Sequence, residues 1–249
     1  MAHCRIDLWF SIVLCLFGPA GYAGQLSSDS SSTLPVFQAL GVVEGEEKIA
    51  YGDNQGYLHI LKKKGRGYVE QWRSRDLGGS IAEVFIRDID ADSLLELVTY
   101  TSRGRIFIFD LRSYAVMWQS SESFFTNISS MSIEDVDEDP YLEIIFCADS
   151  HLYVYDGKSL FEQWRSEEEF QAQDILIADV DGDGQKEIVL NTGWVLDAKF
   201  HDIEWQSPEP FGERLGLLDV DDDGIPELLG EFSGGFLKIW DIDLKREKW

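Results

Sequence analysis

Cysteine is scarce in this sequence, with 3 residues among 249. Cys4 and Cys15 lie in an N-terminal segment that we expect to be removed, which leaves Cys147 alone in the mature chain. Because a single cysteine cannot form an intramolecular disulfide, a fold held together by disulfides is excluded. Cys147 follows the apolar residues 144–146, which predicts a buried and unreactive thiol.

Basic residues are also few, since 21 lysines and arginines stand against 46 aspartates and glutamates. The resulting formal net charge of -25 repels phosphate groups, so we expect no nucleic-acid partner. Hydrophobic residues make up 44% of the chain, which is enough to form a core. Wholesale disorder is therefore not expected.

The N-terminal segment has the pattern of a secretory signal peptide. Arg5 precedes an apolar run over residues 8–17, and small residues follow as far as Ala23. The apolar run is too short to span a membrane as a helix. We predict a signal peptide over residues 1–23, a flexible serine-rich leader over residues 24–33, and a secreted or periplasmic mature chain with no membrane span. The alternative is that the apolar run is a buried part of the folded domain.

Tryptophan recurs along the chain at spacings of 46, 46, 41 and 44 residues. The series consists of Trp72, Trp118, Trp164, Trp205 and Trp249. A second marker, the pattern Asp-x-Asp-x-Asp-x-x-x-Glu, recurs in phase with the first. It begins at Asp88, Asp135, Asp179 and Asp219. Two independent markers that share one period indicate a repeat protein.

Each repeat is predicted to contain short strands and no helix, because residues such as 106–111 alternate with the two-residue period of a β-strand. The strands expected in the second repeat span residues 82–87, 95–101, 105–111 and 115–119. Those expected in the third include residues 152–155 and 160–164. The first repeat, roughly residues 34–77, lacks the acidic turn and has expected strands over residues 48–51, 57–61 and 68–72.

Four short strands in about 40 to 50 residues form the unit of a β-propeller blade. One such sheet cannot bury both of its faces alone, whereas blades stacked in a ring cover each other. We therefore predict an all-β fold, a five-bladed β-propeller of four-stranded blades over residues 34–249. The recurring tryptophans are interpreted as packing residues between blades. For closure of the ring, either the first and fifth blades meet face to face, or residues 36–40 donate a strand to the last blade.

The acidic turns are candidate calcium sites. Calcium prefers six to eight oxygen ligands, and a tight turn with alternate carboxylates can supply them. The side chains at turn positions 1, 3, 5 and 9 are expected to converge with the carbonyl of position 7, and a glycine at position 6 permits the positive φ of a sharp turn. The two complete turns give the candidate ligands Asp179, Asp181, Asp183, Gln185 and Glu187, and Asp219, Asp221, Asp223, Ile225 and Glu227.

Two further turns depart from this pattern at position 6, which is Ser93 in one and Pro140 in the other. Their candidate ligands are Asp88, Asp90, Asp92, Leu94 and Glu96, and Asp135, Asp137, Asp139, Tyr141 and Glu143. Proline cannot adopt a positive φ, so the sequence leaves open whether these two turns bind metal. An EF-hand is excluded, because it needs a glutamate at position 12 and flanking helices. The alternative for every turn is an acidic surface turn without an ion.

The last acidic turn carries a resemblance to a known family. Phe211-Gly212 is followed by Leu-Asp-Val-Asp-Asp-Asp-Gly at residues 218–224 and then by Glu227. These repeats resemble FG-GAP or VCBS repeats, the type found in the integrin α-subunit propeller and in many secreted bacterial proteins. The Gly-Ala-Pro half of the FG-GAP motif is absent, so the resemblance is nearer to VCBS repeats. Over residues 34–249 it implies a propeller with calcium in the acidic turns.

The sequence favours a non-enzymatic function, because it contains no recognisable constellation of nucleophile, metal-binding histidines or phosphate-binding loop. We expect a secreted calcium-binding propeller that recognises or scaffolds a protein partner. No catalytic residue is assigned. A glycoside hydrolase-like enzyme would need carboxylates in the central channel, for which only Glu83 and Asp174 are candidates.

A carbohydrate-binding, lectin-like propeller is the main alternative. It would use repeated aromatic residues to stack on sugars, although aromatic residues at alternate strand positions more often belong to the core. The aromatic candidates are Tyr100, Phe109, Tyr155 and Trp240.

Overall fold

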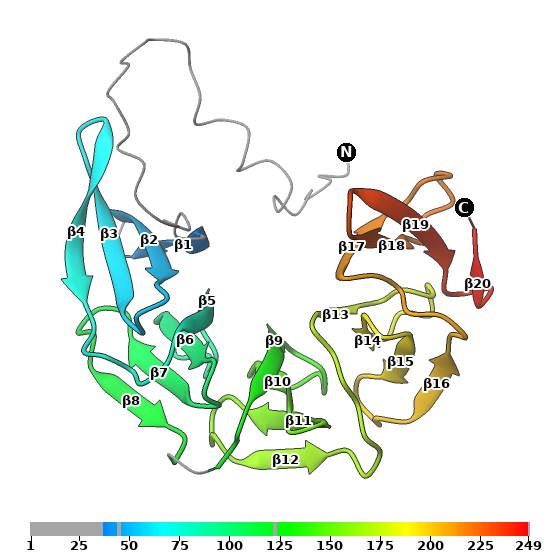
Figure 1. Cartoon of the computed structure of the whole chain (residues 1–249), viewed down its shortest axis with the longest axis horizontal. Coiled ribbons are helices and arrows are strands. Elements are labelled where there is room, and N and C mark those ends of the chain that lie inside the picture. Colours follow the sequence, from blue (N-terminus) through cyan, green and yellow to red (C-terminus); the bar gives the residue numbers. More distant parts are fainter. Residues whose placement is uncertain (1–36, 44–45, 122–123, 249) are drawn as a thin grey trace. The chain divides into compact units, whose positions relative to one another are not determined.

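Twenty β-strands and no helix make up the described part of the chain, residues 37–43, 46–121 and 124–248 of a computed structural model (Figure 1). The predicted all-β class is confirmed. In these residues, no helix has the length and apolarity that a membrane span requires. The predicted signal peptide, the predicted leader and Trp249 lie outside the described residues.

The strands form five antiparallel sheets, each with four strands paired in chain order. The first sheet contains β1 (Phe37–Val43), β2 (Glu46–Gly52), β3 (Leu58–Lys64) and β4 (Gly67–Arg73). The second contains β5 (Ile81–Arg87), β6 (Glu96–Thr101), β7 (Ile106–Asp110) and β8 (Val116–Gln119). The third contains β9 (Ile128–Glu134), β10 (Glu143–Ala148), β11 (His151–Asp156) and β12 (Glu162–Arg165).

The last two sheets repeat this order. The fourth contains β13 (Ile175–Ala178), β14 (Glu187–Leu190), β15 (Trp194–Asp197) and β16 (Ile203–Gln206). The fifth contains β17 (Arg214–Leu218), β18 (Glu227–Phe232), β19 (Phe236–Asp241) and β20 (Arg246–Glu247). The predicted four-stranded repeat is thus present in all five sheets.

The first strand of the chain excludes one of the two alternatives for closure of the ring. Residues 36–40 were considered as a strand donated to the last sheet, but β1 pairs with β2, with Leu40 opposite Ile49. The physical reason is local: strands that follow each other along the chain pair preferentially, because short connections cost little conformational entropy. The first sheet therefore draws all four strands from its own repeat.

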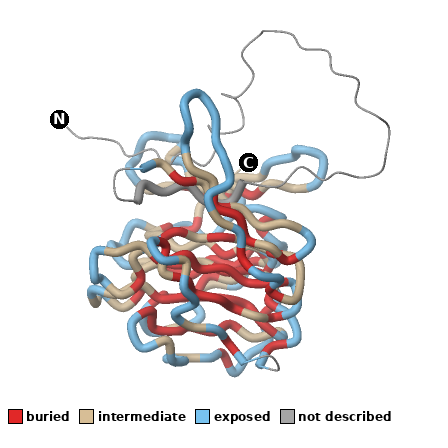
Figure 2. The backbone as a smooth tube through the Cα atoms, turned by 90° about the vertical axis from the view of Figure 1, so that its left-hand side faces the viewer, coloured by how far each residue is buried: buried red, intermediate tan, exposed pale blue. Residues whose placement is uncertain are grey.

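Buried side chains join each sheet to the next. There are four clusters of buried residues, and each contains side chains of two consecutive sheets. In chain order, one residue from each of the two sheets is Leu58 and Phe107, Ile108 and Phe146, Ile145 and Ile188, and Val189 and Leu228. Every residue of β6, β10 and β14 is buried, so both faces of the second, third and fourth sheets are covered. Figure 2 shows buried residues gathered along the central strands and exposed residues along the outer turns. No such cluster joins the fifth sheet to the first within the described residues.

The four recurring tryptophans that belong to the described residues lie at these junctions. Trp72 stacks on Tyr114 of the second sheet with ring centroids 5.0 Å apart, and Trp164 stacks on His201 of the fourth sheet at 4.3 Å. Tyr114 and His201 occupy equivalent turn positions with positive φ, 58° and 64°. The predicted role of these two tryptophans in packing between sheets is confirmed.

The serine two residues after each of the first three tryptophans has a structural role. The side-chain oxygens of Ser74, Ser120 and Ser166 accept hydrogen bonds from backbone N–H groups at 2.9, 3.0 and 3.0 Å. The donors are Leu58, Ile106 and Leu152, which lie at or next to the start of the third strand of each sheet. The repeated Trp-x-Ser pattern therefore combines a contact between sheets with a hydrogen bond inside one sheet.

We expect Gly157→Ala to destabilise the protein. A β-carbon at this position would overlap the carbonyl oxygens of Leu142 and Ile89, at 2.7 Å from the latter. Both are backbone atoms, and the Leu142 N–H also donates to Ile89 O across 3.1 Å. To relieve this overlap, the second and third sheets would have to move relative to each other. We expect the free energy of unfolding to fall by about 1–3 kcal/mol. Urea denaturation measures this loss.

Gly216→Ala is the matched control, because a β-carbon there would meet no atom within 4 Å. Its unfolding midpoint should equal or exceed that of the wild type. Equal midpoints for the two variants would contradict the close approach at Gly157.

Candidate metal centre

The four acidic turns occupy equivalent places in the second to fifth sheets, between the first and second strands. Positions 1 to 8 of each turn lie between these strands, and the glutamate at position 9 is the first residue of the second strand. These four glutamates are Glu96, Glu143, Glu187 and Glu227. The local sequence therefore places aspartates on a turn and a glutamate at the edge of the core.

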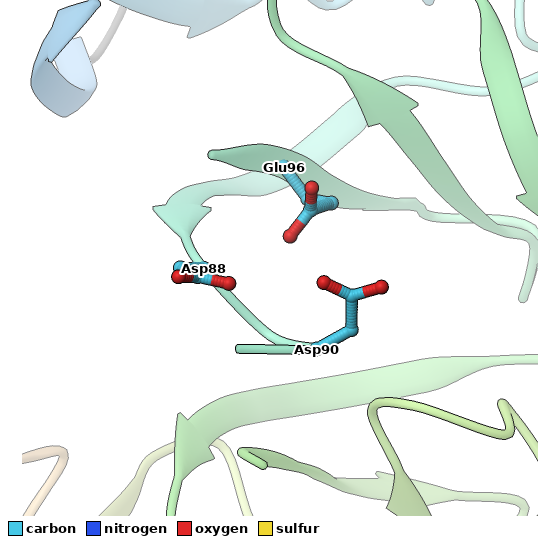
Figure 3. Close-up of side chains that lie close together, drawn as sticks. All are labelled: Asp88, Asp90 and Glu96. Atoms are coloured by element: carbon cyan, nitrogen blue, oxygen red, sulfur yellow. The ribbon is translucent and has the colours of Figure 1, made fainter. Parts of the chain in front are cut away.

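Three carboxyl groups meet in each turn. Oxygen atoms from positions 1, 3 and 9 lie within 4.8 Å of one another. The groups are Asp88, Asp90 and Glu96; Asp135, Asp137 and Glu143; Asp179, Asp181 and Glu187; and Asp219, Asp221 and Glu227. Figure 3 shows the first group, with the three carboxyl groups arranged around a shared space.

A hydrogen bond joins the residues at positions 5 and 7 of each turn. The aspartate at position 5 accepts a hydrogen bond from the backbone N–H of position 7, at distances of 2.8, 2.6, 2.8 and 2.9 Å along the four turns. The pairs are Asp92 with Leu94, Asp139 with Tyr141, Asp183 with Gln185, and Asp223 with Ile225. The aspartate at position 5 lies outside the group formed by positions 1, 3 and 9.

The backbone has a positive φ at position 4 in all four turns and at position 6 in three of them. Position 4 is positive in all four turns: Ala91 at 57°, Glu138 at 69°, Gly182 at 81° and Asp222 at 60°. Position 6 is positive in Ser93, Gly184 and Gly224, whose N–H groups donate to the aspartate at position 1. Pro140 has no N–H to donate, yet its turn brings the same three carboxyl groups together.

The glutamate at position 9 is buried in every turn, with exposed fractions of 2, 0, 1 and 4%. One of its oxygens accepts the backbone N–H of position 2, at 2.8 to 3.0 Å. In Glu143 the other oxygen, Oε1, is buried and has no hydrogen-bond partner. Burial of such an atom lowers the free energy of unfolding unless a cation or a hydrogen-bond donor interacts with it.

The electrostatics of the turns also favour a bound cation. Burial, with a smaller contribution from the neighbouring aspartates, raises the pKa of Glu96 and Glu143 to about 7 and that of Glu187 to about 8. The donor set consists of oxygen atoms alone, which suits a hard cation such as calcium. Within the described chain, no histidine or cysteine belongs to any of these groups, so nothing favours a transition metal.

Two lysines that sequence analysis did not single out reach the turns from the following sheet. Lys158 Nζ lies 3.2 Å from Asp90 Oδ2, and Lys199 Nζ lies 2.5 Å from Glu138 Oε2. Each lysine stands two residues after the aspartate that ends the third strand of its sheet. This repeated Asp-x-Lys spacing is the sequence signal from which the two lysines could have been found. In the fifth sheet the equivalent residue is Asp243. The pKa of Asp181 is raised mainly by burial, and the negative charge of Asp243 raises it further.

The aromatic residues considered for sugar binding belong to the core. Tyr100, Phe109, Tyr155 and Trp240 have exposed fractions of 2, 3, 7 and 3%. Their rings pack among buried side chains between sheets, so these four residues cannot stack on a ligand from solvent.

The two carboxylates considered for catalysis are tied to neighbouring groups. Glu83 Oε2 accepts a hydrogen bond from the Tyr100 hydroxyl at 3.0 Å, and Asp174 Oδ2 accepts one from the Leu215 N–H at 2.7 Å. Burial raises the pKa of both side chains, and the charge of Asp174 raises that of Glu83 further. The hydrogen bond from Leu215 to Asp174 links the fourth sheet to the first strand of the fifth.

No protein-family model and no curated protein sequence matches the chain. Solved structures do match it. It is similar to Sqt1 from Saccharomyces cerevisiae, with a TM-score of 0.61 and 12% identity over 81% of this chain and 57% of that one. It is similar to BamB from Moraxella catarrhalis, with a TM-score of 0.56 and 16% identity over 86% of this chain and 63% of that one.

A third similar structure is the V. cholerae biofilm matrix protein Bap1, with a TM-score of 0.58 and 22% identity over 86% of this chain and 39% of that one. Sqt1 and BamB are β-propellers. The fold is propeller-like. The chain spans between 39 and 63% of the length of these three structures, and at these identities the likeness shows the fold alone.

We expect the metal-free protein to lose stability as the pH rises from about 5 to 8. The folded-state pKa of Glu143, about 7, lies above its ordinary value of 4.5, so the folded protein holds a proton that the unfolded chain has released. That contribution is complete below about pH 4.5 and is lost as the pH passes 7. Glu143→Gln should make the loss smaller. Urea denaturation in metal-free buffer at several pH values measures it.

Glu162→Gln is the control, since Glu162 is an exposed residue of the same sheet. It removes the same charge and should keep the wild-type dependence on pH. If both variants followed the wild-type curve, the burial cost assigned to Glu143 would be wrong.

Proposed function

We propose that the protein is a secreted, calcium-binding β-propeller whose five sheets are its blades, and that it recognises or scaffolds a protein partner. The observation that carries this proposal is the buried Oε1 atom of Glu143, which has no hydrogen-bond partner and lies in a group with Asp135 and Asp137. An unpaired, buried carboxylate oxygen beside two further carboxylates calls for a cation.

The repetition of this group supports calcium as a structural ion. Three carboxylates within 4.8 Å repel one another in each of four turns, and the repulsion is stronger where burial lowers the local dielectric. A divalent cation with oxygen ligands would offset it, and calcium accepts the flexible geometry that turns provide. Because the unfolded chain lacks the site, binding would stabilise the native state.

The recognition role draws on the fold and the surface. Propeller-like folds present many loops at their rims, where binding residues can vary without change to the core. The strongly negative surface suits a partner with complementary charge. Secretion rests on the sequence pattern of residues 1–23.

Calcium should raise the melting temperature of the protein relative to EGTA. At a calcium concentration one hundred times the dissociation constant, one site adds about 2.7 kcal/mol to the free energy of unfolding. Asp137→Asn removes a carboxylate from the Glu143 group and should reduce the calcium-dependent shift. Differential scanning calorimetry in calcium and in EGTA provides the comparison.

Asp202→Asn is the matched control, because Asp202 is exposed and outside the acidic turns. It should keep the full calcium-dependent shift. A wild-type melting temperature that is identical in calcium and in EGTA would refute structural calcium binding.

A protein partner should be recovered with the purified chain from an extracytoplasmic fraction in calcium, and less of it in EGTA. The reason is that calcium would hold the turns of the blades in their binding conformation. Affinity capture with quantitative mass spectrometry measures the ratio. Recovery of no stable protein, together with specific binding on a glycan array, would replace the proposed partner class with carbohydrate.

A further inference from the structure

The acidic turn of the fifth sheet already contains a positive charge from the chain itself. Lys248 Nζ lies 2.7 Å from Asp221 Oδ2 and 2.5 Å from Glu227 Oε1. These two carboxylates are positions 3 and 9 of the turn that begins at Asp219. The Lys248 side chain is only 15% exposed. Its ammonium group therefore stands where a bound cation would meet the same carboxylates.

The turn that begins at Asp179 provides a natural comparison. It has the same residue types at positions 1, 3, 5, 6 and 9. Its own lysine, Lys186, points to the third sheet, where Nζ contacts Asp135 O at 2.8 Å and Glu134 Oε2 at 3.3 Å. Across the described residues, no lysine or arginine forms an ion pair with the carboxylates of this turn. Two of the three carboxylates grouped in the fifth-sheet turn therefore pair with a lysine, whereas within the described residues none of those in the fourth-sheet turn does.

The segment that carries Lys248 is held by a short strand pairing and by two ion pairs, Lys238 with Glu247 and Arg246 with Asp241. β20 has two residues, which pair only with Trp240 and Asp241 of β19. The Lys248 N–H donates one further hydrogen bond to Ile239 O at 2.7 Å. A cavity of about 130 Å³ beside Lys248 is lined by Asp221, Asp223, Glu227 and Asp243 among others. Displacement of the ammonium group would thus break a short pairing next to an existing space.

We propose that Lys248 is the resident cation of the Asp219 turn, so that calcium binds there only by displacing Lys248 and β20, and binds more tightly to the Asp179 turn. This inference rests on the calcium binding proposed above. Two cations that share the same carboxylates repel each other, so occupancy by one excludes the other. Lys248 thereby sets the calcium affinity of its turn and couples that turn to the last strand.

Calcium titration of the full chain by isothermal calorimetry tests the proposal. Asp179→Asn should remove a site that binds calcium more tightly than the Asp219 turn does. Lys248→Met should strengthen binding at a weaker site, on the order of tenfold or more. The gain should disappear in the double variant Lys248→Met, Asp219→Asn. Lys64→Met is the control for net charge, because Lys64 is exposed and lies in the first sheet, which has no acidic turn.

Amide hydrogen exchange supplies a second readout, because it reports the displacement of Lys248 independently of the calcium affinity. In the wild type, the amide of Lys248 should exchange faster at saturating calcium than in EGTA, as its bond to Ile239 is broken. Unchanged exchange, or equal calcium affinities in Lys248→Met and Lys64→Met, would overturn the role of Lys248 while leaving calcium binding intact. The absence of calcium binding in the wild type and in every variant would instead refute the proposed function as well.

Discussion

The buried glutamate that begins the second strand of four sheets is the constraint on which the acidic turns depend. One of its oxygens is fixed by the amide of position 2, and its carboxyl group lies beside the aspartates of positions 1 and 3. Because the glutamate is buried, its charged form is costly, so the side chain is stabilised either by a proton, as the raised pKa of Glu96, Glu143 and Glu187 indicates, or by a cation. Among the described residues, a lysine pairs with this glutamate in the last turn alone, where Lys248 contacts Glu227. Lys158 and Lys199 pair instead with Asp90 and Glu138 of their turns.

Most of the fold could be predicted from the sequence because its signals are local. Two-residue alternation and polar turns gave strand positions close to those observed, as in residues 82–87 against β5 at Ile81–Arg87. The position of β1 could not be predicted in the same way. Residues 37–43 contain neither the tryptophan nor the acidic marker, and the choice between pairing with β2 and with a distant sheet depends on tertiary structure.

The site was less predictable, since part of it comes from other repeats. The spacing of aspartates and glutamate predicted that positions 1, 3, 5 and 9 converge with the carbonyl of position 7, and of these the carboxyl groups of positions 1, 3 and 9 lie together. Lys158 and Lys199 approach from the following sheet, so the repeats that contain their turns do not contain these lysines. Lys248 belongs to the same repeat as its turn but follows it far along the chain, beyond β20. The positive φ at position 4 was equally hidden, because Ala91 and Glu138 carry no signal for it.

The junctions between sheets have a further consequence. Each buried cluster is shared by two consecutive sheets, and the stacked pairs Trp72–Tyr114 and Trp164–His201 likewise connect only neighbours. Cohesion in such an array is transmitted from one unit to the adjacent one, as in a linear chain of coupled elements. Damage at one junction therefore weakens the contact between its two sheets and leaves the contacts at the other junctions in place.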